Sequence, residues 1–211
     1  DHVLSVDLHS GQIQGFFSIP VDDISARSVL RRGLDNIKFD ANACVTIVAP
    51  DAAGAGRAEN FKNYFQETTS VDTAFAVMNK WKLDDTDHNE HGTGTGLTME
   101  LVGKVDGTDC IIVDDMLDTA KTLLSAVREL KRCGAKRVFA CITHALFNDI
   151  STLTQLVANS DLELLIVTNT LDHERNPTVM EVLKKYPNKI VIESVGNLVA
   201  ETVRRIHFEE S

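Results

Sequence analysis

The sequence lacks the features that mark several classes of protein. It has no apolar run approaching the ~18 residues that a membrane-spanning helix needs. Lys and Arg number 21 against 31 Asp and Glu, the net charge is −10, and no basic cluster stands out. A chain of this charge is repelled by the phosphate backbone of nucleic acids. We therefore expect neither a membrane protein nor a non-specific nucleic-acid binder.

Cysteines are few, and none of them form a C-x-x-C pair. The four are Cys44, Cys110, Cys133 and Cys141, and three of them lie within or beside apolar stretches. This usage is typical of reduced thiols in the interior of a cytoplasmic protein and not of a disulfide framework. The chain also lacks internal repeats and low-complexity tails. Its 211 residues suggest one domain, or one and a half.

Short apolar, β-branched runs alternate with segments of helical periodicity. The strands are expected at Val3–Leu8, Val45–Pro50, Thr73–Met78, Thr98–Val102, Cys110–Val113, Arg137–Ile142, Leu162–Thr168 and Lys189–Ile192. The helices are expected at Ile24–Gly33, Ala55–Phe65, Thr119–Cys133, Ile150–Ala158, Thr178–Lys185 and Leu198–His207. Such alternation predicts an α/β fold with a mostly parallel sheet flanked by helices.

Two details refine this pattern. The expected helix Thr119–Cys133 has an apolar stripe on one face, and Gly134 directly after it is typical of a helix C-terminus. The segment Trp81–Leu97 is acidic and rich in Gly and Thr, and it has no core to contribute. We interpret it as a long mobile loop between two strands.

The stretch CIIVDDMLDTAKT, Cys110–Thr122, carries the most chemical information. Four apolar residues predict a buried strand, which ends in Asp114 and Asp115 and leads into a helix near Thr119. In a parallel sheet, ligands bind beyond the carboxyl ends of the strands. The free N–H groups of the helix start attract a phosphate, and Thr119 and Thr122 can add hydroxyl donors. Two carboxylates beside a phosphate site make sense if they accept hydrogen bonds from sugar hydroxyls or reach a divalent cation. The stretch therefore suits a sugar phosphate.

A simpler interpretation stays open. Asp118 or Thr119 can cap the helix with its side chain, and the two aspartates can be solvated turn residues. Short motifs of this kind produce false positives, so the surrounding strand and helix have to support the assignment.

The string VDDMLDTAKT resembles the phosphoribosyl-pyrophosphate loop of type I phosphoribosyltransferases. Other segments narrow the resemblance to the ribose-phosphate pyrophosphokinase family, also called phosphoribosyl pyrophosphate synthetases. These segments are DLHSGQIQGFFSIPVDDI, TIVAPDAAGAGRA, RVFACITHALF, IVTNT and LVAETVRRIH. The similarity runs nearly end to end and implies a phosphoribosyltransferase-like fold. It corresponds to the C-terminal half of the family's subunit and the end of the N-terminal half.

The resemblance implies a role for individual residues. Ribose 5-phosphate would be held by the loop residues Asp114, Asp115, Asp118, Thr119, Ala120, Lys121 and Thr122. His9 and Asp51 match the positions near magnesium, which prefers oxygen ligands and keeps several waters. Lys80 and Lys82 match a catalytic basic pair on a flexible loop, where cations stabilise the charge of phosphoryl transfer. Without the resemblance, His9 would be interpreted as a structural histidine and the lysines as a solvated strand end.

Three departures from the family pattern affect the expected site. Lys121 stands where the family usually has glycine, which lets a backbone approach phosphate closely. The segment DAAGAGRA has Ala53 for a usual glycine and Gly56 where lysine is common in one branch. Lys82 replaces an arginine and loses its two-pronged contact.

The resemblance also implies a domain boundary. Residues 1–20 would end a preceding domain and 21–211 would form the phosphoribosyltransferase-like domain, with the N-terminal half of the parent enzyme absent. We expect this piece alone to be inactive and to bind ribose 5-phosphate better than ATP.

The implied activity is magnesium-dependent transfer of diphosphate from ATP to the C1 hydroxyl of ribose 5-phosphate, by a homo-oligomer that is a dimer or hexamer. One alternative is a non-catalytic associated subunit that regulates such an enzyme. Another is a phosphoribosyltransferase, which explains the loop but not DLHSGQIQGFF.

Overall fold

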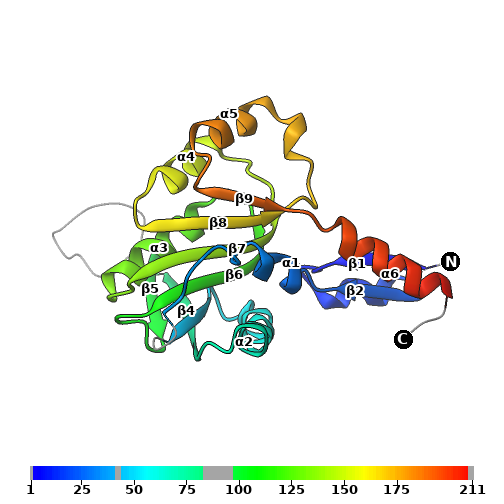
Figure 1. Ribbon diagram of the computed structural model, residues 1–211, viewed down its shortest axis with the longest axis horizontal. Coiled ribbons are helices and arrows are strands. Elements are labelled where there is room, and N and C mark those ends of the chain that lie inside the picture. Colours follow the sequence, from blue (N-terminus) through cyan, green and yellow to red (C-terminus); the bar gives the residue numbers. More distant parts are fainter. Residues whose placement is uncertain (1, 41–43, 83–96, 209–211) are drawn as a thin grey trace.

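The computed structural model describes residues 2–40, 44–82 and 97–208. Among these residues, a seven-stranded sheet has the order β5-β4-β3-β6-β7-β8-β9 (Figure 1). Neighbouring strands pair in parallel, and β5 is antiparallel to β4. The expected mostly parallel sheet is therefore confirmed. The strands are β3 (Val45–Ala49), β4 (Thr73–Lys82), β5 (Leu97–Val102), β6 (Asp109–Leu117), β7 (Arg137–Ala145), β8 (Leu162–Thr168) and β9 (Ile190–Glu193).

Helices cover both faces of this sheet. One hydrophobic core lies between the sheet and the helices α1 (Arg27–Arg32) and α2 (Ala55–Thr69). Phe61 and Phe65 of α2 are fully buried in it. The other core joins the sheet to α3 (Lys121–Arg132), α4 (Ile150–Ala158) and α5 (Pro177–Lys185). Strands between two helical layers lose contact with water on both faces, which explains their continuous apolar sequences. All five residues of β3 are buried, for example.

The central strand β6 is longer than predicted. Its first five residues are buried, and burial then alternates from Asp114 to Leu117. The two aspartates therefore lie within the strand and not beyond its end. Consecutive side chains of a strand point to opposite faces, so this extension determines where each carboxyl group lies.

A small second sheet lies at one end of the molecule. The strands β1 (Val3–Val6) and β2 (Val21–Ile24) pair in parallel, and the 3-10 helix η1 (Gly11–Phe16) lies between them in the chain. The last helix, α6 (Gly196–Phe208), projects beyond the main sheet on the same side (Figure 1). The expected domain boundary falls between β1 and β2, which pair with each other, and it stays a prediction.

Hydrogen bonds join this small sheet to the carboxyl end of β7. The carboxylate of Asp7 accepts from Thr143 Oγ1 at 2.7 Å and from the backbone N–H of Ala26 at 3.1 Å. His144 Nε2 lies 2.9 Å from the carbonyl oxygen of Val6, and its Nδ1 lies 2.9 Å from Thr170 Oγ1. These contacts fix the segment that carries His9 beside the main sheet.

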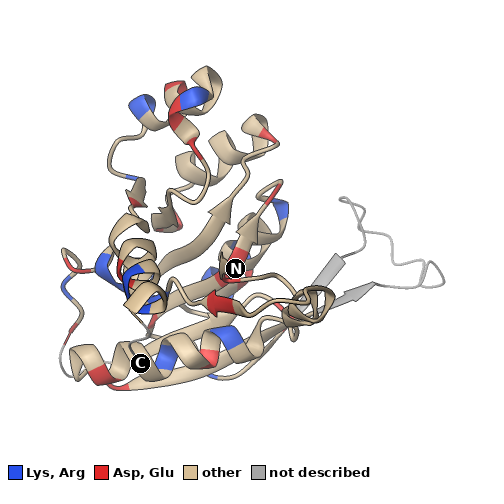
Figure 2. Ribbon diagram, turned by 90° about the vertical axis from the view of Figure 1, so that its right-hand side faces the viewer, with Lys and Arg blue, Asp and Glu red and all other residues tan. Residues whose placement is uncertain are grey.

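The cysteines and the helices of the structure bear on two further expectations. All four cysteines are free, and burial raises the pKa of Cys110 to about 11. Within the three described stretches, none of the helices combines the length and apolar character of a membrane span. Acidic and basic residues are interspersed over the helices of the ribbon in Figure 2.

Candidate functional site

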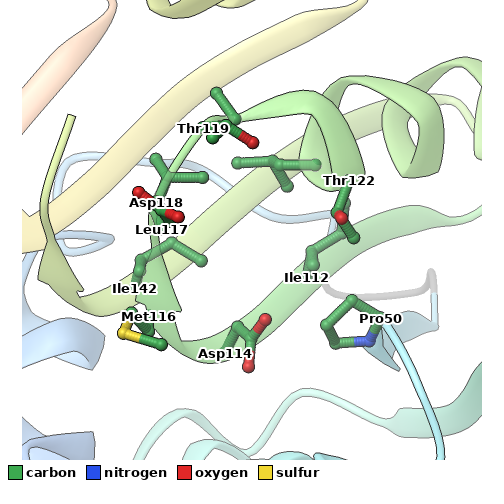
Figure 3. Close-up of a pocket in the computed structure, with 11 residues that line it drawn as sticks. Pro50, Ile112, Asp114, Met116, Leu117, Asp118, Thr119, Thr122 and Ile142 are labelled. Carbon is green, nitrogen blue, oxygen red and sulfur yellow. The ribbon is translucent and has the colours of Figure 1, made fainter. Parts of the chain in front are cut away.

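A pocket of about 240 Å³ opens beside the carboxyl ends of β3, β6 and β7 (Figure 3). Five residues of the predicted sugar-phosphate loop line it: Asp114, Asp118, Thr119, Ala120 and Thr122. The rest of the lining is largely apolar and consists of Pro50, Ile112, Met116, Leu117, Leu123 and Ile142. Thr119 and Thr122 are both exposed and therefore accessible to a ligand. The structure thus gathers most of the predicted loop residues around one cavity.

The helix that starts at this pocket has no side-chain cap. Helix α3 begins at Lys121, and the residue before it, Ala120, has left-handed backbone angles of φ 61° and ψ −3°. In the described part of the chain, no side chain accepts a hydrogen bond from the first N–H groups of α3 as a cap. The simpler interpretation, in which Asp118 or Thr119 caps the helix, is therefore wrong. Uncapped N–H groups and the positive end of the helix dipole form a site for an anion.

A neighbouring loop holds the turn between β6 and α3 in place. The backbone N–H of Leu146 donates to the carbonyl of Leu117 at 2.8 Å, and that of Asn148 donates to the carbonyl of Asp118 at 3.2 Å. The Asn148 side-chain amide also donates to the Asp118 carboxylate at 2.6 Å. The loop after β7 thus supports both the backbone of the turn and one of its acidic side chains.

The two consecutive aspartates do not share the pocket. Asp114 lines it together with Ile112, and both belong to the face of β6 that α3 covers. The Asp115 side chain is 2% exposed and lies outside the lining, near α2. We expected both carboxylates to face one ligand because we placed them beyond the strand end. The strand continues past them, so its alternation separates them.

Arg57 of α2 contacts both carboxylates, and sequence reasoning assigned it no role. Its Nη2 lies 3.0 Å from Asp115 Oδ2, and its Nη1 lies 3.4 Å from Asp114 Oδ1. A signal for Arg57 was present, because it follows Asp51 by six residues, in the helix after β3. The helices after parallel strands begin at the same sheet edge, where ligands bind.

The environments of the two aspartates move their pKa values in opposite directions. Burial, the hydrogen bond with Asp115 and the charge of Asp115 raise the pKa of Asp114 to about 7. Burial alone would also raise the pKa of Asp115, but the hydrogen bond from His9 and the charge of Arg57 lower it overall. Asp115 is therefore the carboxylate that keeps its negative charge, and Asp114 is the one that gains a proton near neutral pH.

His9 lies against Asp115 and keeps one ring nitrogen for another partner. Its Nδ1 is 2.7 Å from Asp115 Oδ2, and its side chain is 70% exposed. Histidines that bind metals commonly donate their other ring N–H to a carboxylate, which fixes the tautomer and the ring orientation. The contact with Asp115 therefore leaves His9 arranged as a metal ligand would be, with Nε2 as the binding atom.

Asp51 lies in the turn after β3, where its Oδ1 accepts the backbone N–H of Gly54 at 3.0 Å. Across the described residues, no group of three or more His, Cys, Asp or Glu side chains is arranged for a metal ion. Magnesium usually takes only one or two protein carboxylates and completes its shell with water and substrate phosphates. The Asp51 carboxylate is a ligand of the type that such a site uses.

The structure describes the two predicted basic residues by their backbone. The backbones of Lys80 and Lys82 belong to β4, where they pair with Met99 and Leu97 of β5. Both were expected on a flexible loop, and the antiparallel pairing with β5 explains why β4 continues through them. The rest of the expected loop, residues 83–96, lies outside the described chain. Lys121 begins α3 and is exposed, and it does not line the pocket.

Comparison with known proteins places the chain among its relatives. Residues 93–211, just over half of the chain, match the family described as phosphoribosyl synthetase-associated domain. The whole chain is 37% identical to ribose-phosphate pyrophosphokinase from Chromobacterium violaceum, of which it covers 57%. It is also 37% identical over 212 residues to ribose-phosphate pyrophosphokinase 2 from Schizosaccharomyces pombe, of which it covers 59%.

A solved structure supports the same placement. The crystal structure of phosphoribosylpyrophosphate synthetase from Mycobacterium smegmatis matches with a TM-score of 0.73 and 30% identity, over 99% of this chain and 59% of that one. The chain thus spans less than two thirds of the length of these relatives. From the matched family, the relatives and the shared fold, we conclude that the chain belongs to the ribose-phosphate pyrophosphokinase (phosphoribosyl synthetase) family.

Proposed function

We propose that the protein transfers diphosphate from ATP to the C1 hydroxyl of ribose 5-phosphate, giving phosphoribosyl pyrophosphate and AMP. The observation that carries this proposal is the uncapped start of α3, which opens into a pocket with acidic and hydroxyl side chains. The names of the relatives support the same activity.

The pocket suits the two ends of a sugar phosphate. The phosphate group binds at the start of α3, where backbone N–H groups and the hydroxyls of Thr119 and Thr122 donate hydrogen bonds. The sugar hydroxyls donate to the carboxylates of Asp114 and Asp118. Asp115 lies on the other face of β6 and supports the site through Arg57 and His9.

The reaction is a phosphoryl-type displacement. The C1 oxygen of the sugar forms a bond to the β-phosphorus of ATP, and the bond from that phosphorus to the α–β bridging oxygen breaks. AMP leaves with the bridging oxygen, and the hydroxyl proton passes to solvent. Charge that develops on the phosphate oxygens is stabilised by Lys80 and Lys82, which carry fixed positive charge. Positioning and charge neutralisation account for most of the rate in reactions of this type.

Magnesium is the cofactor we propose, with His9 and Asp51 as its protein ligands. When bound, it neutralises the phosphate charge of ATP and orients the diphosphate. His9 is prepared for this role by its hydrogen bond to Asp115, which leaves Nε2 directed away from that carboxylate.

We also propose that the protein works as a homo-oligomer, a dimer or hexamer. Two segments outside the main sheet expose large apolar side chains, which are typical of interfaces. Around η1 these are Ile13, Phe16, Phe17 and Ile19, and on α6 they are Val203 and Phe208.

A second candidate is a non-catalytic subunit that assembles with an active enzyme. The matched family is described as an associated domain, and Lys121 stands at a loop position where the resemblance predicts glycine. Such a subunit would retain the sugar-phosphate pocket without turnover.

The test combines binding and turnover on the same protein. With the full-length protein, we expect calorimetry to detect the binding of ribose 5-phosphate, and AMP release to be measurable with saturating magnesium and inorganic phosphate. Asp118→Asn should weaken both, while Glu59→Gln, at an exposed position on α2, should change neither. Binding without AMP release would instead favour the associated subunit. The absence of any ribose 5-phosphate binding would overturn both candidates.

A further inference from the structure

The carboxyl group of Asp114 is held in place from behind the pocket. One of its oxygens, Oδ1, accepts the backbone N–H of Asp115 at 2.9 Å and lies 3.4 Å from Arg57 Nη1. Both contacts act on the same oxygen and restrict the rotation of the side chain. The Asp115 backbone and the Arg57 side chain are therefore both placed to set the orientation that Asp114 presents to the pocket.

The same arginine also compensates the buried neighbour. Asp115 Oδ2 is approached by Arg57 Nη2 at 3.0 Å and by His9 Nδ1 at 2.7 Å, and the Asp115 side chain is 2% exposed. A buried carboxylate is stable only when partners of this kind surround it. Arg57 thus contacts two aspartates with two nitrogens of one planar group, which a lysine cannot reproduce.

These contacts form one continuous chain across β6. It runs from His9 through Asp115 and Arg57 to Asp114, and so from the proposed metal ligand to the proposed sugar ligand. The Arg57 side chain is 22% exposed, and Arg57 is not among the residues that line the pocket. Its influence on a bound sugar is therefore indirect.

We infer that Arg57 is a positioning residue, which orients Asp114 toward the sugar hydroxyls and ties that orientation to the His9–Asp115 pair. This inference rests on the proposed function, because it assumes that Asp114 contacts ribose 5-phosphate. It adds a residue on α2 to a site otherwise built from the turn after β6.

The experiment compares Arg57→Gln, Arg57→Lys and Asp114→Asn in the full protein, with Arg128→Gln as the matched control. Arg128 is an exposed arginine on α3. Calorimetry measures the affinity for ribose 5-phosphate, and thermal unfolding reports the folded fraction of each variant. We expect Arg57→Gln to weaken binding about tenfold or more, as is typical of residues that orient a ligand-binding group. Arg57→Lys keeps the charge without the planar fork and should recover only part of the affinity.

Turnover measurements distinguish a positioning role of Arg57 from a purely structural one. With folded Arg57→Gln, the KM for ribose 5-phosphate should rise about tenfold, and added guanidinium ion at low millimolar concentration should restore part of it. Equal affinities for wild type and folded Arg57→Gln, with Asp114→Asn still impaired, would overturn the inference and leave the proposed function intact. Failure of Asp114→Asn to weaken binding would instead overturn the proposed sugar contact itself.

Discussion

His9 Nδ1 lies 2.7 Å from Asp115 Oδ2, although the two residues are 106 positions apart in the chain. His9 comes from the segment after β1 and Asp115 from the central strand of the main sheet. The contact brings the small sheet into the same site as the turn after β6. It also gives Asp115 Oδ2 two partners, because Arg57 approaches the same oxygen.

Replacement of Asp115 should therefore be more damaging to stability than replacement of Asp114. We expect Asp115→Asn to lower the free energy of unfolding by roughly 2–3 kcal/mol, because the buried charge that Arg57 contacts is removed. Urea denaturation near pH 7.5 measures this value. Asp114→Asn is the comparison, and it should cost clearly less, since burial already disfavours the ionised form of Asp114. Equal losses for both variants would contradict the assignment of the charge to Asp115.

The raised pKa of Asp114 predicts a pH dependence of stability. Its pKa rises from an ordinary value of 3.8 to about 7, so the folded protein holds a proton that the unfolded chain has lost. The resulting stabilisation is fully present below pH 4 and is lost as the pH rises through about 7. The difference in unfolding free energy between wild type and Asp114→Asn should therefore shrink between pH 4 and 7. A difference that is constant with pH would contradict this prediction.

Ligand binding should change in the opposite direction with pH. A sugar hydroxyl donates best to an ionised carboxylate, so affinity for ribose 5-phosphate should rise as the pH passes from 6 to 8. The phosphate group of the ligand also ionises, with a pKa of about 6. Asp114→Asn controls for this second effect. In this variant the affinity should still change with pH near about 6, where the phosphate ionises, and should no longer change near pH 7, where Asp114 ionises in the wild type. Calorimetry at several pH values measures both.

The unusual lysine of the loop should have little influence on binding. Lys121 is exposed and does not line the pocket. We expect Lys121→Ala to change the affinity for ribose 5-phosphate by less than about threefold, the size of a weak, screened surface interaction. A loss of tenfold would show instead that Lys121 contacts the phosphate. An isothermal titration at two salt concentrations separates a direct contact from a screened one.

A buried ion pair at the opposite end of the strands should matter for folding and not for binding. Arg137 donates to Asp109 through Nε at 2.9 Å and through Nη2 at 2.6 Å, and Asp109 is 3% exposed. We expect Asp109→Asn to lower the free energy of unfolding by roughly 2–4 kcal/mol, because it breaks a paired buried charge. Arg132→Ala, which breaks an exposed pair with Glu129 on α3, should have little effect. Unchanged ribose 5-phosphate affinity in folded Asp109→Asn would separate this pair from the site.

Local signals predicted some elements completely. Helix α4 spans Ile150–Ala158 and β8 spans Leu162–Thr168, both as the sequence indicates. The helix has Asp149 as its cap, which accepts from the N–H of Thr152 at 3.0 Å. Gly134 has a φ of +90°, as expected of a residue that ends a helix. In these places the residue that determines where a helix begins or ends lies next to that helix in the sequence.

Errors arose where distant partners decide the structure. The expected helix from Ile24 begins only at Arg27, because Ile24 pairs with Val6 in the small sheet. Strand β6 extends through the aspartates because β7 pairs with it as far as Leu117. Arg57 acquires its importance only when α2 is placed against β6. None of these partners is adjacent in sequence, so neither periodicity nor capping signals could identify them.

The hydrogen bond from Thr143 to Asp7 spans 136 positions and has a consequence for the order of assembly. Contacts between residues so distant in sequence form late, because closing a long loop costs entropy before any contact compensates for it. Strands β3 to β9 and the turn before α3 need nothing from residues 1–24 for their own pairing. We therefore expect the turn proposed to bind the sugar phosphate to be complete while the segment carrying His9 is still unattached. Capacity for a sugar phosphate would then precede capacity for a metal during folding.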